Sequence, residues 1–254
     1  MIDRSTLFSL DGKRALVTGA GRGIGLAAAQ ALAAFGAHVT LVSRSGDDIA
    51  AAAAGIRVGG GSADHTALDV TDIDAVRAWV AEVPPYDVLV NNAGTNRPGP
   101  FVDVKVEDFD LVSGLNIRAS FFVAQAVARR LIETGKTGSI IHVSSQMGHV
   151  GAAHRTVYCT TKFAIEGMSK AMAVELAPHG IRVNTLCPTF IETPMTEPFF
   201  RNPEFRAAVL SKIKLGRLGT VDDLAGSLIL LASDASSLMT GTSLVVDGGW
   251  TAEE

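Results

Sequence analysis

The chain contains, at residues 14–25, the stretch Arg-Ala-Leu-Val-Thr-Gly-Ala-Gly-Arg-Gly-Ile-Gly, an apolar run followed at once by a glycine-rich turn. The run 14–18 predicts a buried strand, and the Ala-rich segment 23–35 after the turn predicts a helix. Glycines permit positive φ and a close approach of backbone to ligand. A helix start offers free N–H groups and a positive dipole. The stretch therefore predicts a strand–turn–helix unit that binds a phosphate group, with a glycine-rich turn that binds nothing as the alternative.

Short β-branched runs and longer helical patterns continue to alternate along the chain. We expect further strands at residues 38–43, 86–91, 139–144, 181–186 and 243–247, and helices at residues 71–83, 104–133, 156–178 and 220–233. Such alternation implies βαβ units with right-handed crossovers. The predicted fold is α/β: a three-layer doubly wound parallel sheet (Rossmann fold) of about seven strands with helices on both faces. Without a linker or repeat, we expect a single domain over residues 1–254.

Composition and charge restrict the class of partner. A chain of 254 residues with 47% hydrophobic residues can fold without disulfides or metal. The net charge of -4 argues against nucleic acid or an anionic membrane as a partner. No window approaches the roughly 20 apolar residues of a membrane span, and the first residues do not resemble a secretory signal. Because Cys159 and Cys187 lack metal-ligand spacing, we expect a cytoplasmic protein without a metal site.

A Tyr-x-x-x-Lys pair, Tyr158 and Lys162, lies in the predicted helix 156–178. This spacing puts both side chains on one helix face, where an ammonium favours the phenolate form of the tyrosine. A phenol with a lowered pKa can move protons in carbonyl chemistry. The same spacing arises by chance in many helices, so the pair gains its meaning from the rest of the sequence.

The motifs together resemble the short-chain dehydrogenase/reductase family. Thr18-Gly19-x-x-x-Gly23-x-Gly25, Asn91-Asn92-Ala93-Gly94 and Ser145 with Tyr158-x-x-x-Lys162 stand in the family's order, and the resemblance extends to Val246-Asp247-Gly248-Gly249. It implies hydride transfer between NAD(P) and a secondary alcohol or ketone, usually in a homotetramer.

The resemblance also implies a catalytic tetrad of Asn116, Ser145, Tyr158 and Lys162. Tyr158 would transfer the hydroxyl proton, and Lys162 would lower the Tyr158 pKa and bind the nicotinamide ribose. Ser145 would hydrogen-bond the substrate oxygen. Asn116 would hold a water linking Lys162 to solvent, or would merely kink its helix. The adjacent Ser144 competes with Ser145, but strand alternation would point it away.

Cofactor contacts are carried over position by position from the resemblance. Asp69 matches the acid that binds adenine, with an N-cap of the next helix as the alternative. Thr189 replaces an expected glycine, which leaves the local backbone geometry open. The full implied set is Thr18, Gly19, Arg22, Gly23, Ile24, Gly25, Ser43, Arg44, Asp69, Val70, Asn92, Ala93, Gly94, Tyr158, Lys162, Pro188, Ile191 and Thr193.

The end of the second predicted strand favours NADP over NAD. An NAD enzyme needs an acid there to hold the ribose hydroxyls. This chain has Ser43 followed by Arg44, and Arg22 lies in the phosphate turn. A guanidinium suits a 2′-phosphate, whereas a carboxylate would repel it. NAD stays open as the alternative, because Asp47 or Asp48 could hold a ribose; we interpret both as helix-start acids.

The substrate is less defined than the reaction. Residues 195–215 are expected to form a lid. Gln146, Asn96 and His154 are the first candidates for substrate contacts, and further candidates are Met147, His149, Arg155 and Arg97. This polar set favours a sugar, polyol or hydroxy acid. A 3-oxoacyl thioester, or a non-catalytic NAD(P)-binding sensor, is the alternative.

Overall fold

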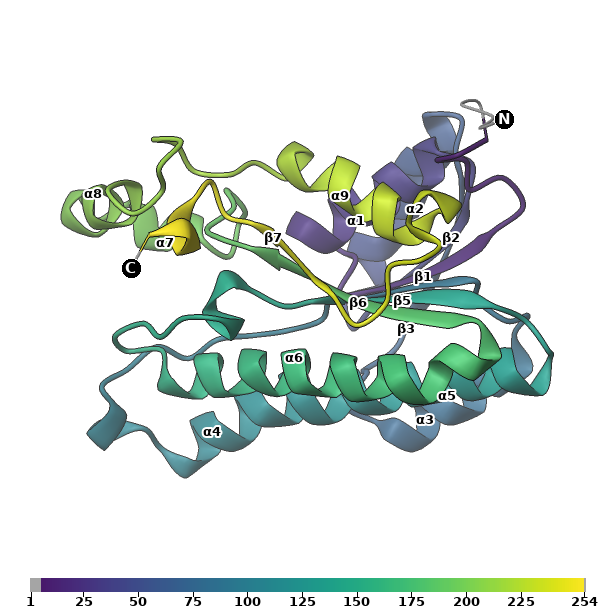
Figure 1. Ribbon diagram of the computed structural model, residues 1–254, viewed down its shortest axis with the longest axis horizontal. Coiled ribbons are helices and arrows are strands. Elements are labelled where there is room, and N and C mark those ends of the chain that lie inside the picture. The colour runs from purple at the N-terminus through teal and green to yellow at the C-terminus, as the bar shows by residue number, and fades with distance from the viewer. Residues whose placement is uncertain (1–5, 254) are drawn as a thin grey trace.

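The computed structural model describes residues 6–253, which build one parallel sheet with helices on both faces (Figure 1). The strands are β1 (Arg14–Thr18), β2 (His38–Ser43), β3 (Ser62–Ala67), β4 (Val88–Asn91), β5 (Gly138–Val143), β6 (Ile181–Pro188) and β7 (Ser243–Val246). They form a 7-stranded sheet in the order β3-β2-β1-β4-β5-β6-β7, and every pairing is parallel. The predicted doubly wound Rossmann fold is confirmed.

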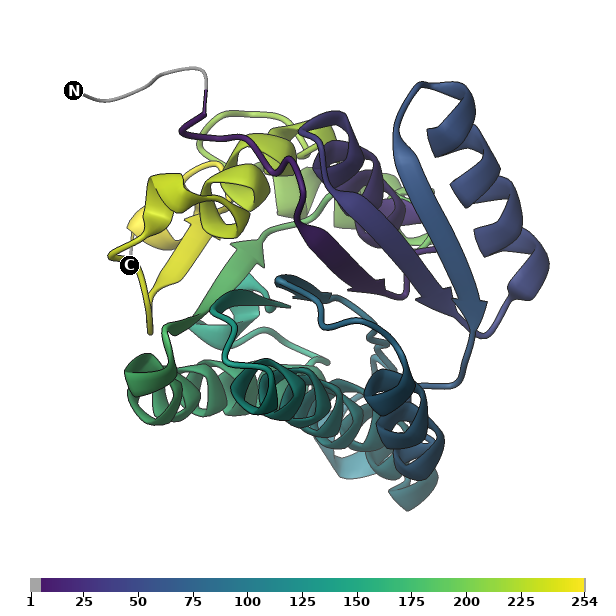
Figure 2. The same ribbon diagram turned by 90° about the vertical axis from the view of Figure 1, so that its right-hand side faces the viewer.

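The helices form two layers that cover opposite faces of the sheet. They are α1 (Gly23–Ala34), α2 (Gly46–Val58), α3 (Ile73–Glu82), α4 (Val106–Ser113), α5 (Ser120–Glu133), α6 (Thr156–Leu176), α7 (Glu197–Phe200), α8 (Pro203–Leu210) and α9 (Asp222–Ala232). One layer contains α1, α2 and α9, and the other contains α3, α4, α5 and α6 (Figure 1, Figure 2). The short helices α7 and α8 lie beyond the sheet, beside the C-terminal segment.

Each face of the sheet has its own apolar core. Leu32 of α1, Ile49 of α2 and Leu228 of α9 pack on one face. Val76 of α3 and Val127 of α5 pack on the other. The five central strands are buried along nearly all of their length because a sheet covered on both faces buries both sets of alternating side chains.

The strand order reverses direction at β1. From β1 the chain moves outward through β2 and β3, and then returns to β4 on the other side of β1. In open α/β sheets, ligands bind in the crevice outside the carboxyl ends of the strands at such a reversal. The ends of β1 and β4 carry the glycine-rich turn and the segment that begins with Asn92, so the topology brings these two motifs together.

Two elements had no predicted residue range from the sequence. The edge strand β3 has the sequence Ser-Ala-Asp-His-Thr-Ala and is mostly exposed, so it lacks the apolar run that marks a buried strand. Helix α2 contains the expected helix-start acids Asp47 and Asp48 in its first turn. Its Ala-rich sequence gives a weak apolar pattern, with Ile49, Ala53 and Ile56 as its buried residues.

The expected continuous helix at 104–133 is divided. Helices α4 and α5 are joined by a π-helical segment, Gly114–Ala119. The combined span Val106–Glu133 is long and apolar enough to cross a membrane, which corrects the expectation that no window approaches that composition. About half of its most apolar window is buried inside the protein (50%), as is typical of a core helix.

Candidate functional site

The glycine-rich turn between β1 and α1 has the geometry of a phosphate cradle. Gly19 and Gly23 have positive φ values of 64° and 58°. A Cβ atom at Gly25 would lie 2.3 Å from the carbonyl oxygen of Gly19, so only glycine fits there. Helix α1 begins without a side-chain cap and without an acid in its first turn. Its first N–H groups therefore lack a side-chain partner, which fits a pyrophosphate.

Thr18 joins this turn to the end of β4. Its hydroxyl oxygen accepts hydrogen bonds from the backbone N–H groups of Asn92 (3.0 Å) and Ala93 (3.1 Å) and lies 3.3 Å from Asn91 Oδ1. Asn92 Nδ2 donates to the carbonyl oxygens of Thr18 and Gly19 at 3.0 and 3.2 Å. Both side chains thus hydrogen-bond to the backbone of the turn and of the segment after β4. We therefore expect them to support the cofactor site by fixing this backbone.

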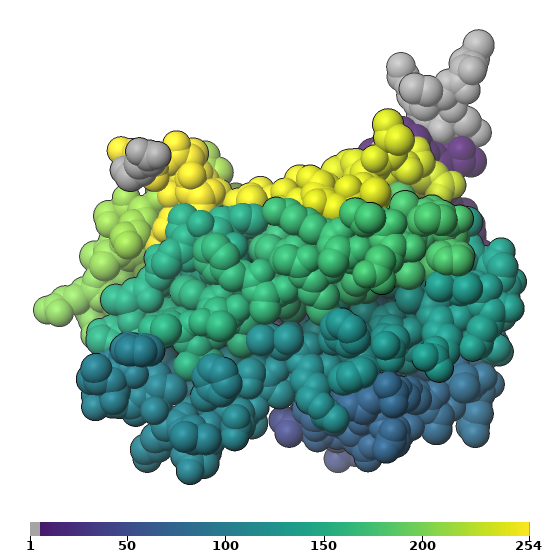
Figure 3. Space-filling model, turned by 60° about the horizontal axis from the view of Figure 1, so that its bottom comes forward, coloured from purple at the N-terminus to yellow at the C-terminus, as the bar shows by residue number. Residues whose placement is uncertain are grey.

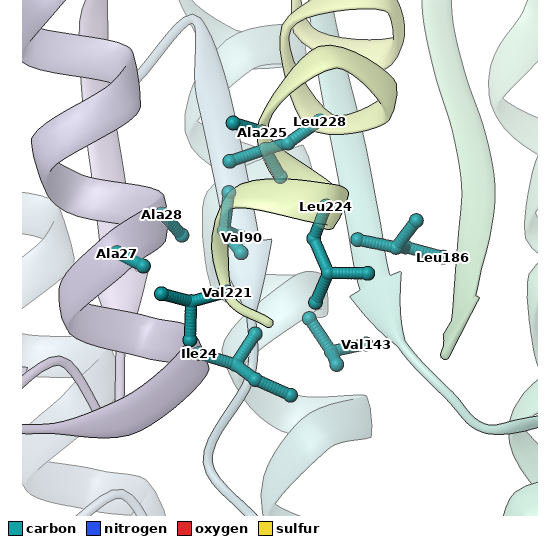
Figure 4. A pocket seen from close by; sticks show the side chains of 10 residues that line it. All are labelled: Ile24, Ala27, Ala28, Val90, Val143, Leu186, Val221, Leu224, Ala225 and Leu228. Atoms are coloured by element: carbon teal, nitrogen blue, oxygen red, sulfur yellow. The ribbon is translucent and has the colours of Figure 1, made fainter. Parts of the chain in front are cut away.

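Three of the expected cofactor residues direct their side chains into the protein. Ile24 borders a void of about 10 Å³ between α1, α9 and the sheet, whose lining is wholly apolar (Figure 4). Val70 and Ala93 belong to the core on the other face. A void of this size holds at most about one water and has no polar partner for it. Val70 is buried, whereas Ile24 and Ala93 stay partly exposed.

The residues expected to determine the preference for NADP or NAD lie at the end of β2. Ser43 Oγ lies 3.5 Å from where a Cβ of Gly21 would stand, so β2 ends against the phosphate turn. The Arg44 side chain is 77% exposed, and its guanidinium lies 4.0 Å from Asp69 Oδ2. Arg22 is also exposed. Arg22 and Arg44 thus expose two cations near the phosphate turn, and Arg44 already has the Asp69 carboxylate as a neighbour.

Asp69 is not the cap of α3. Asp72 is the N-cap, and its side chain accepts from the backbone N–H of Ala75. Asp69 Oδ1 instead accepts hydrogen bonds from the N–H and hydroxyl of Thr71 at 2.9 and 2.8 Å. The pKa of Asp69 is lowered: burial opposes this shift, while the Thr71 hydrogen bonds and the Arg44 charge produce it. The capping alternative is therefore wrong.

Tyr158, Lys162 and Ser145 meet at the carboxyl ends of β5 and β6. Lys162 Nζ lies 5.4 Å from the centre of the Tyr158 ring and donates a 2.8 Å hydrogen bond to the carbonyl oxygen of Val143. Ser145 is buried just after β5, hydrogen-bonds with Tyr158, and donates to Gln146 Oε1 at 2.7 Å. The three expected catalytic side chains therefore share one site.

Ser144 points to the opposite side of the strand. It lies among Glu166 and Cys187, with its Oγ 3.1 Å from where a Cβ of Gly148 would stand. The alternation along β5 thus separates the two serines as the sequence predicts, and only Ser145 reaches Tyr158.

The pKa values of the pair differ from the expectation. Burial raises the pKa of Tyr158 to about 12, and the Ser145 hydrogen bond and the Arg155 charge only partly counteract this. Burial lowers the pKa of Lys162 to about 8, which Cys187 and Glu166 partly counteract. The expected depression of the Tyr158 pKa by Lys162 is therefore absent in the chain by itself, because desolvation of the phenolate outweighs the nearby charges.

Asn116 lies in the π-helical segment with both side-chain polar atoms engaged. Its Oδ1 accepts from the N–H of Thr95 at 2.8 Å, and its Nδ2 donates to Thr95 O at 2.9 Å and to Thr161 Oγ1 at 3.1 Å. The amide thus ties the segment after β4 to helix α6. A water-holding role for Asn116 would have to pass through its backbone carbonyl.

The segment after β6 lies against the phosphate turn. A Cβ at Gly23 would be 3.5 Å from Thr193, so these two residues border the same space. The Pro188 carbonyl oxygen lies 3.4 Å from Ser145 Oγ, and Ile191 is buried in the core. Thr189, which replaces an expected glycine, has no positive φ. The backbone there needs no glycine.

The expected substrate residues lie at different depths. Gln146 is buried beside Ser145, Asn96 is partly buried, and the His154 side chain is exposed. The Nε2 atom of Gln146 and the Oδ1 atom of Asn96 are buried without a hydrogen-bond partner. In the expected lid, Phe200 and Phe205 pack edge-on against Phe190 and belong to one small apolar cluster.

Glu166, one helical turn after Lys162, was not among the residues predicted from the sequence. Its buried carboxylate accepts hydrogen bonds from Thr185 (3.0 Å), Ser243 and the Cys187 thiol (3.3 Å). Burial opposes ionisation of Glu166, but the hydrogen bonds lower its pKa. The spacing from Lys162 was the available signal. Among residues 6–253, Glu166, His149 and Cys187 also hold ligand atoms within 4.8 Å of one another, but these hydrogen bonds already occupy the carboxylate.

Comparison with known proteins gives the same family as the motifs. A family model described as enoyl-(acyl carrier protein) reductase matches residues 19–251. The D-erythrulose reductase of Gallus gallus is 43% identical, with 95% of this chain and 97% of that protein covered. The gluconate 5-dehydrogenase of Gluconobacter oxydans is 40% identical, with coverage of 96% and 97%.

A solved structure extends this likeness to the whole fold. The gluconate 5-dehydrogenase of Burkholderia cenocepacia, in complex with NADP and tartrate, matches with a TM-score of 0.95 and 37% identity over 99% of this chain and 100% of that one. Fold, site and relatives together define a nicotinamide-dependent oxidoreductase. The chain belongs to the short-chain dehydrogenase/reductase family.

Proposed function

We propose that the protein is an NADP-dependent oxidoreductase that interconverts a ketone and a secondary alcohol on a sugar, polyol or hydroxy acid. The observation that carries the proposal is the meeting of Tyr158, Ser145 and Lys162 at the carboxyl edge of the sheet. An uncapped helix start with a glycine cradle lies at the same edge, as a dinucleotide requires.

The side chains divide the chemistry among them. The nicotinamide, when bound, supplies or accepts the hydride at the substrate carbon. In reduction, the protonated Tyr158 hydroxyl gives its proton to the substrate oxygen, and Ser145 hydrogen-bonds that oxygen as negative charge develops. The Lys162 ammonium, held by Val143 O, stabilises the phenolate that remains. Asn116 positions the π-helical segment against α6 through Thr161.

NADP is the preferred cofactor because the end of β2 offers cations rather than a carboxylate. Arg44 and Arg22 are exposed there, and Ser43 presents a hydroxyl beside the turn. The remaining proposed contacts are the backbones of Ile24, Val70, Ala93 and Gly94, the Asp69 carboxylate, and the segment from Pro188 to Thr193. The NADP bound in the related gluconate 5-dehydrogenase supports this assignment.

The relatives favour polyhydroxylated substrates over 3-oxoacyl thioesters, because those named act on erythrulose and gluconate. The site agrees, since buried amide groups of Gln146 and Asn96 suit hydroxyl partners. A sensor that only binds cofactor would have no use for the Tyr158–Ser145 pair.

We further propose one domain over the whole chain, with residues 195–215 as the lid, and a cytoplasmic homotetramer. Helices α4 to α6 form a broad outer face (Figure 3). Phe121 is 43%, Phe163 50% and Val174 77% exposed on α5 and α6, which is typical of a surface that another subunit covers. Phe163→Glu is expected to reduce the mass measured by light scattering, whereas Val58→Glu, at an exposed apolar residue of α2 in the other helix layer, should not reduce it.

The activity is tested by hydride transfer from NADPH and NADH to erythrulose, L-xylulose, 5-ketogluconate and an acetoacetyl thioester. We expect NADPH oxidation with at least one of the polyhydroxy ketones. Tyr158→Phe should lower the rate roughly 10²- to 10⁴-fold while NADP binding, followed by calorimetry, persists. Full activity in Tyr158→Phe, or turnover with the thioester alone, would contradict the proposal.

A further inference from the structure

Arg155 is a buried cation without an anion. The residue precedes α6 and is only 7% exposed. Its guanidinium lies 5.2 Å from the centre of the Phe199 ring in the expected lid, and its Nη1 atom is buried with no hydrogen-bond partner. No carboxylate of residues 6–253 lies within 4.0 Å of it, whereas seven other lysine and arginine side chains have such a neighbour.

A buried guanidinium without a carboxylate neighbour would be stabilised by an anionic ligand. Burial lowers the pKa of Arg155, yet an arginine stays charged at any physiological pH. Leaving a charge desolvated and unpaired is costly, and the Phe199 ring compensates for only part of that cost. The partner must therefore come from outside the described chain.

Arg155 also faces the reacting centre. It is the N-cap residue of α6, three residues before Tyr158, and lies close enough to Tyr158 for the two groups to interact electrostatically. A ligand whose oxygen meets the Tyr158 and Ser145 hydroxyls therefore has Arg155 beside it. The guanidinium fork can bind a carboxylate through two parallel hydrogen bonds.

Two further unpartnered atoms belong to residues near Ser145. The Nε2 atom of Gln146 is buried while its Oε1 accepts from Ser145, and the Oγ1 atom of Thr189 is buried next to Pro188. An amide donor and a hydroxyl group suit alcohol groups, which both donate and accept. The surroundings of Ser145 thus offer partners for hydroxyl groups, with the charge of Arg155 on the Tyr158 side.

We propose that Arg155 binds a carboxylate of the substrate, so that the enzyme acts on polyhydroxy acids and their keto acids rather than on neutral ketoses. Gln146 and Thr189 bind hydroxyl groups of the same molecule. The inference rests on the proposed function and narrows its substrate class. A neutral ketose would fill the same space and leave the guanidinium unpaired.

The test compares 5-ketogluconate with L-sorbose, which carries a hydroxymethyl group in place of the carboxylate. With NADPH, wild type is expected to prefer 5-ketogluconate. Arg155→Gln should lower kcat/KM for the keto acid by roughly 10- to 100-fold, mainly through KM, because a hydrogen bond to a charged group is lost. For L-sorbose, kcat/KM should change by less than about threefold, because this substrate has no carboxylate that Arg155 could bind.

Two variants serve as controls. Arg155→Lys keeps the positive charge and should recover part of the activity on the keto acid. It keeps the test valid if Arg155→Gln does not fold. Arg201→Gln removes an exposed arginine that pairs with Glu197 near the same lid, and it should leave both substrates unchanged. Retention of NADP binding in each variant confirms that the fold persists.

Three results would overturn the inference. A wild type that prefers L-sorbose leaves the proposed function standing but refutes the carboxylate. An equal loss on both substrates, together with a shifted pH profile, means that Arg155 acts through Tyr158 instead. Absence of hydride transfer with 5-ketogluconate, L-sorbose and all other polyhydroxy ketones refutes the proposed function and this inference with it.

Discussion

Lys162 Nζ donates a 2.8 Å hydrogen bond to the carbonyl oxygen of Val143, the last residue of β5. The bond fixes the ammonium 5.4 Å from the centre of the Tyr158 ring. It joins helix α6 to the strand that precedes Ser145, so the proposed acid/base group and the proposed oxyanion donor keep one relative position. In the proposed mechanism, the rate depends on the ionisation of Tyr158 and Lys162.

Reduction and oxidation should respond to pH in opposite directions. Burial lowers the pKa of Lys162 to about 8, so the ammonium is present below that pH and is lost as the pH rises through it. Tyr158, with its pKa raised to about 12, remains a proton donor throughout. Ketone reduction should hold its rate below about pH 8 and fall above it, whereas alcohol oxidation should rise with pH. A reduction rate that stays flat well above pH 8 would contradict this assignment.

Glu166 is expected to stabilise the fold and to keep Lys162 protonated. Glu166→Gln removes charge-assisted hydrogen bonds from Thr185, Ser243 and Cys187, which should cost about 1–3 kcal/mol in the free energy of unfolding. Without the carboxylate, the pKa of Lys162 falls, so the alkaline decline of reduction should move to lower pH. Urea denaturation and pH profiles measure the two effects. Glu175→Gln, exposed on the same helix, should change neither.

The cofactor preference should depend on the end of β2. Ser43→Asp places a carboxylate beside the expected 2′-phosphate, and Arg44→Ala removes a cation. Each is expected to shift the kcat/KM ratio from NADPH toward NADH by roughly 10- to 150-fold, the value of one hydrogen bond to a charged group. Arg57→Ala, on the far end of α2, serves as the control arginine. An unchanged kcat/KM ratio in both test variants would mean that residues other than Ser43 and Arg44 determine the cofactor preference.

Gly25→Ala tests the phosphate cradle. Its Cβ would stand 2.3 Å from the Gly19 carbonyl oxygen and 2.5 Å from Asn92 Nδ2, so the turn must move. We expect a loss of about 1–3 kcal/mol in stability and weaker NADP binding by calorimetry. Gly226→Ala, in α9 with nothing within 4 Å, should instead stabilise by about 0.5–1 kcal/mol. Wild-type NADP affinity in Gly25→Ala would show that the turn does not contact the cofactor.

His142 should make the protein sensitive to acid. It is fully buried in β5 with both ring nitrogens unpaired, and burial lowers its pKa from 6.5 to about 4. Between these values the unfolded chain binds more protons than the folded one, so stability is full above about pH 6.5 and falls toward pH 4 by up to about 3 kcal/mol. His142→Leu should remove part of this decline in thermal unfolding. His179→Gln, at an exposed histidine, should leave it as in wild type.

The sequence by itself determined the fold class and the chemistry of the site. Runs rich in apolar and β-branched residues, such as 14–18 and 38–43, could be recognised because strands covered on both faces bury most of their side chains. Spacing along one helix related Tyr158 to Lys162, and alternation along a strand separated Ser145 from Ser144. The edge strand β3 escaped recognition because one exposed side leaves it polar.

Only the tertiary structure decided which groups are paired and how they ionise. The Thr18 hydroxyl binds the backbone of Asn92, and the Asn116 amide binds Thr95 and Thr161. Burial raises the pKa of Tyr158, which the sequence pattern had predicted to be lowered. Desolvation and hydrogen-bond satisfaction depend on segments far apart in the chain, which no local pattern records. For the same reason, Arg155 was one polar candidate among several until the fold buried it without an anion.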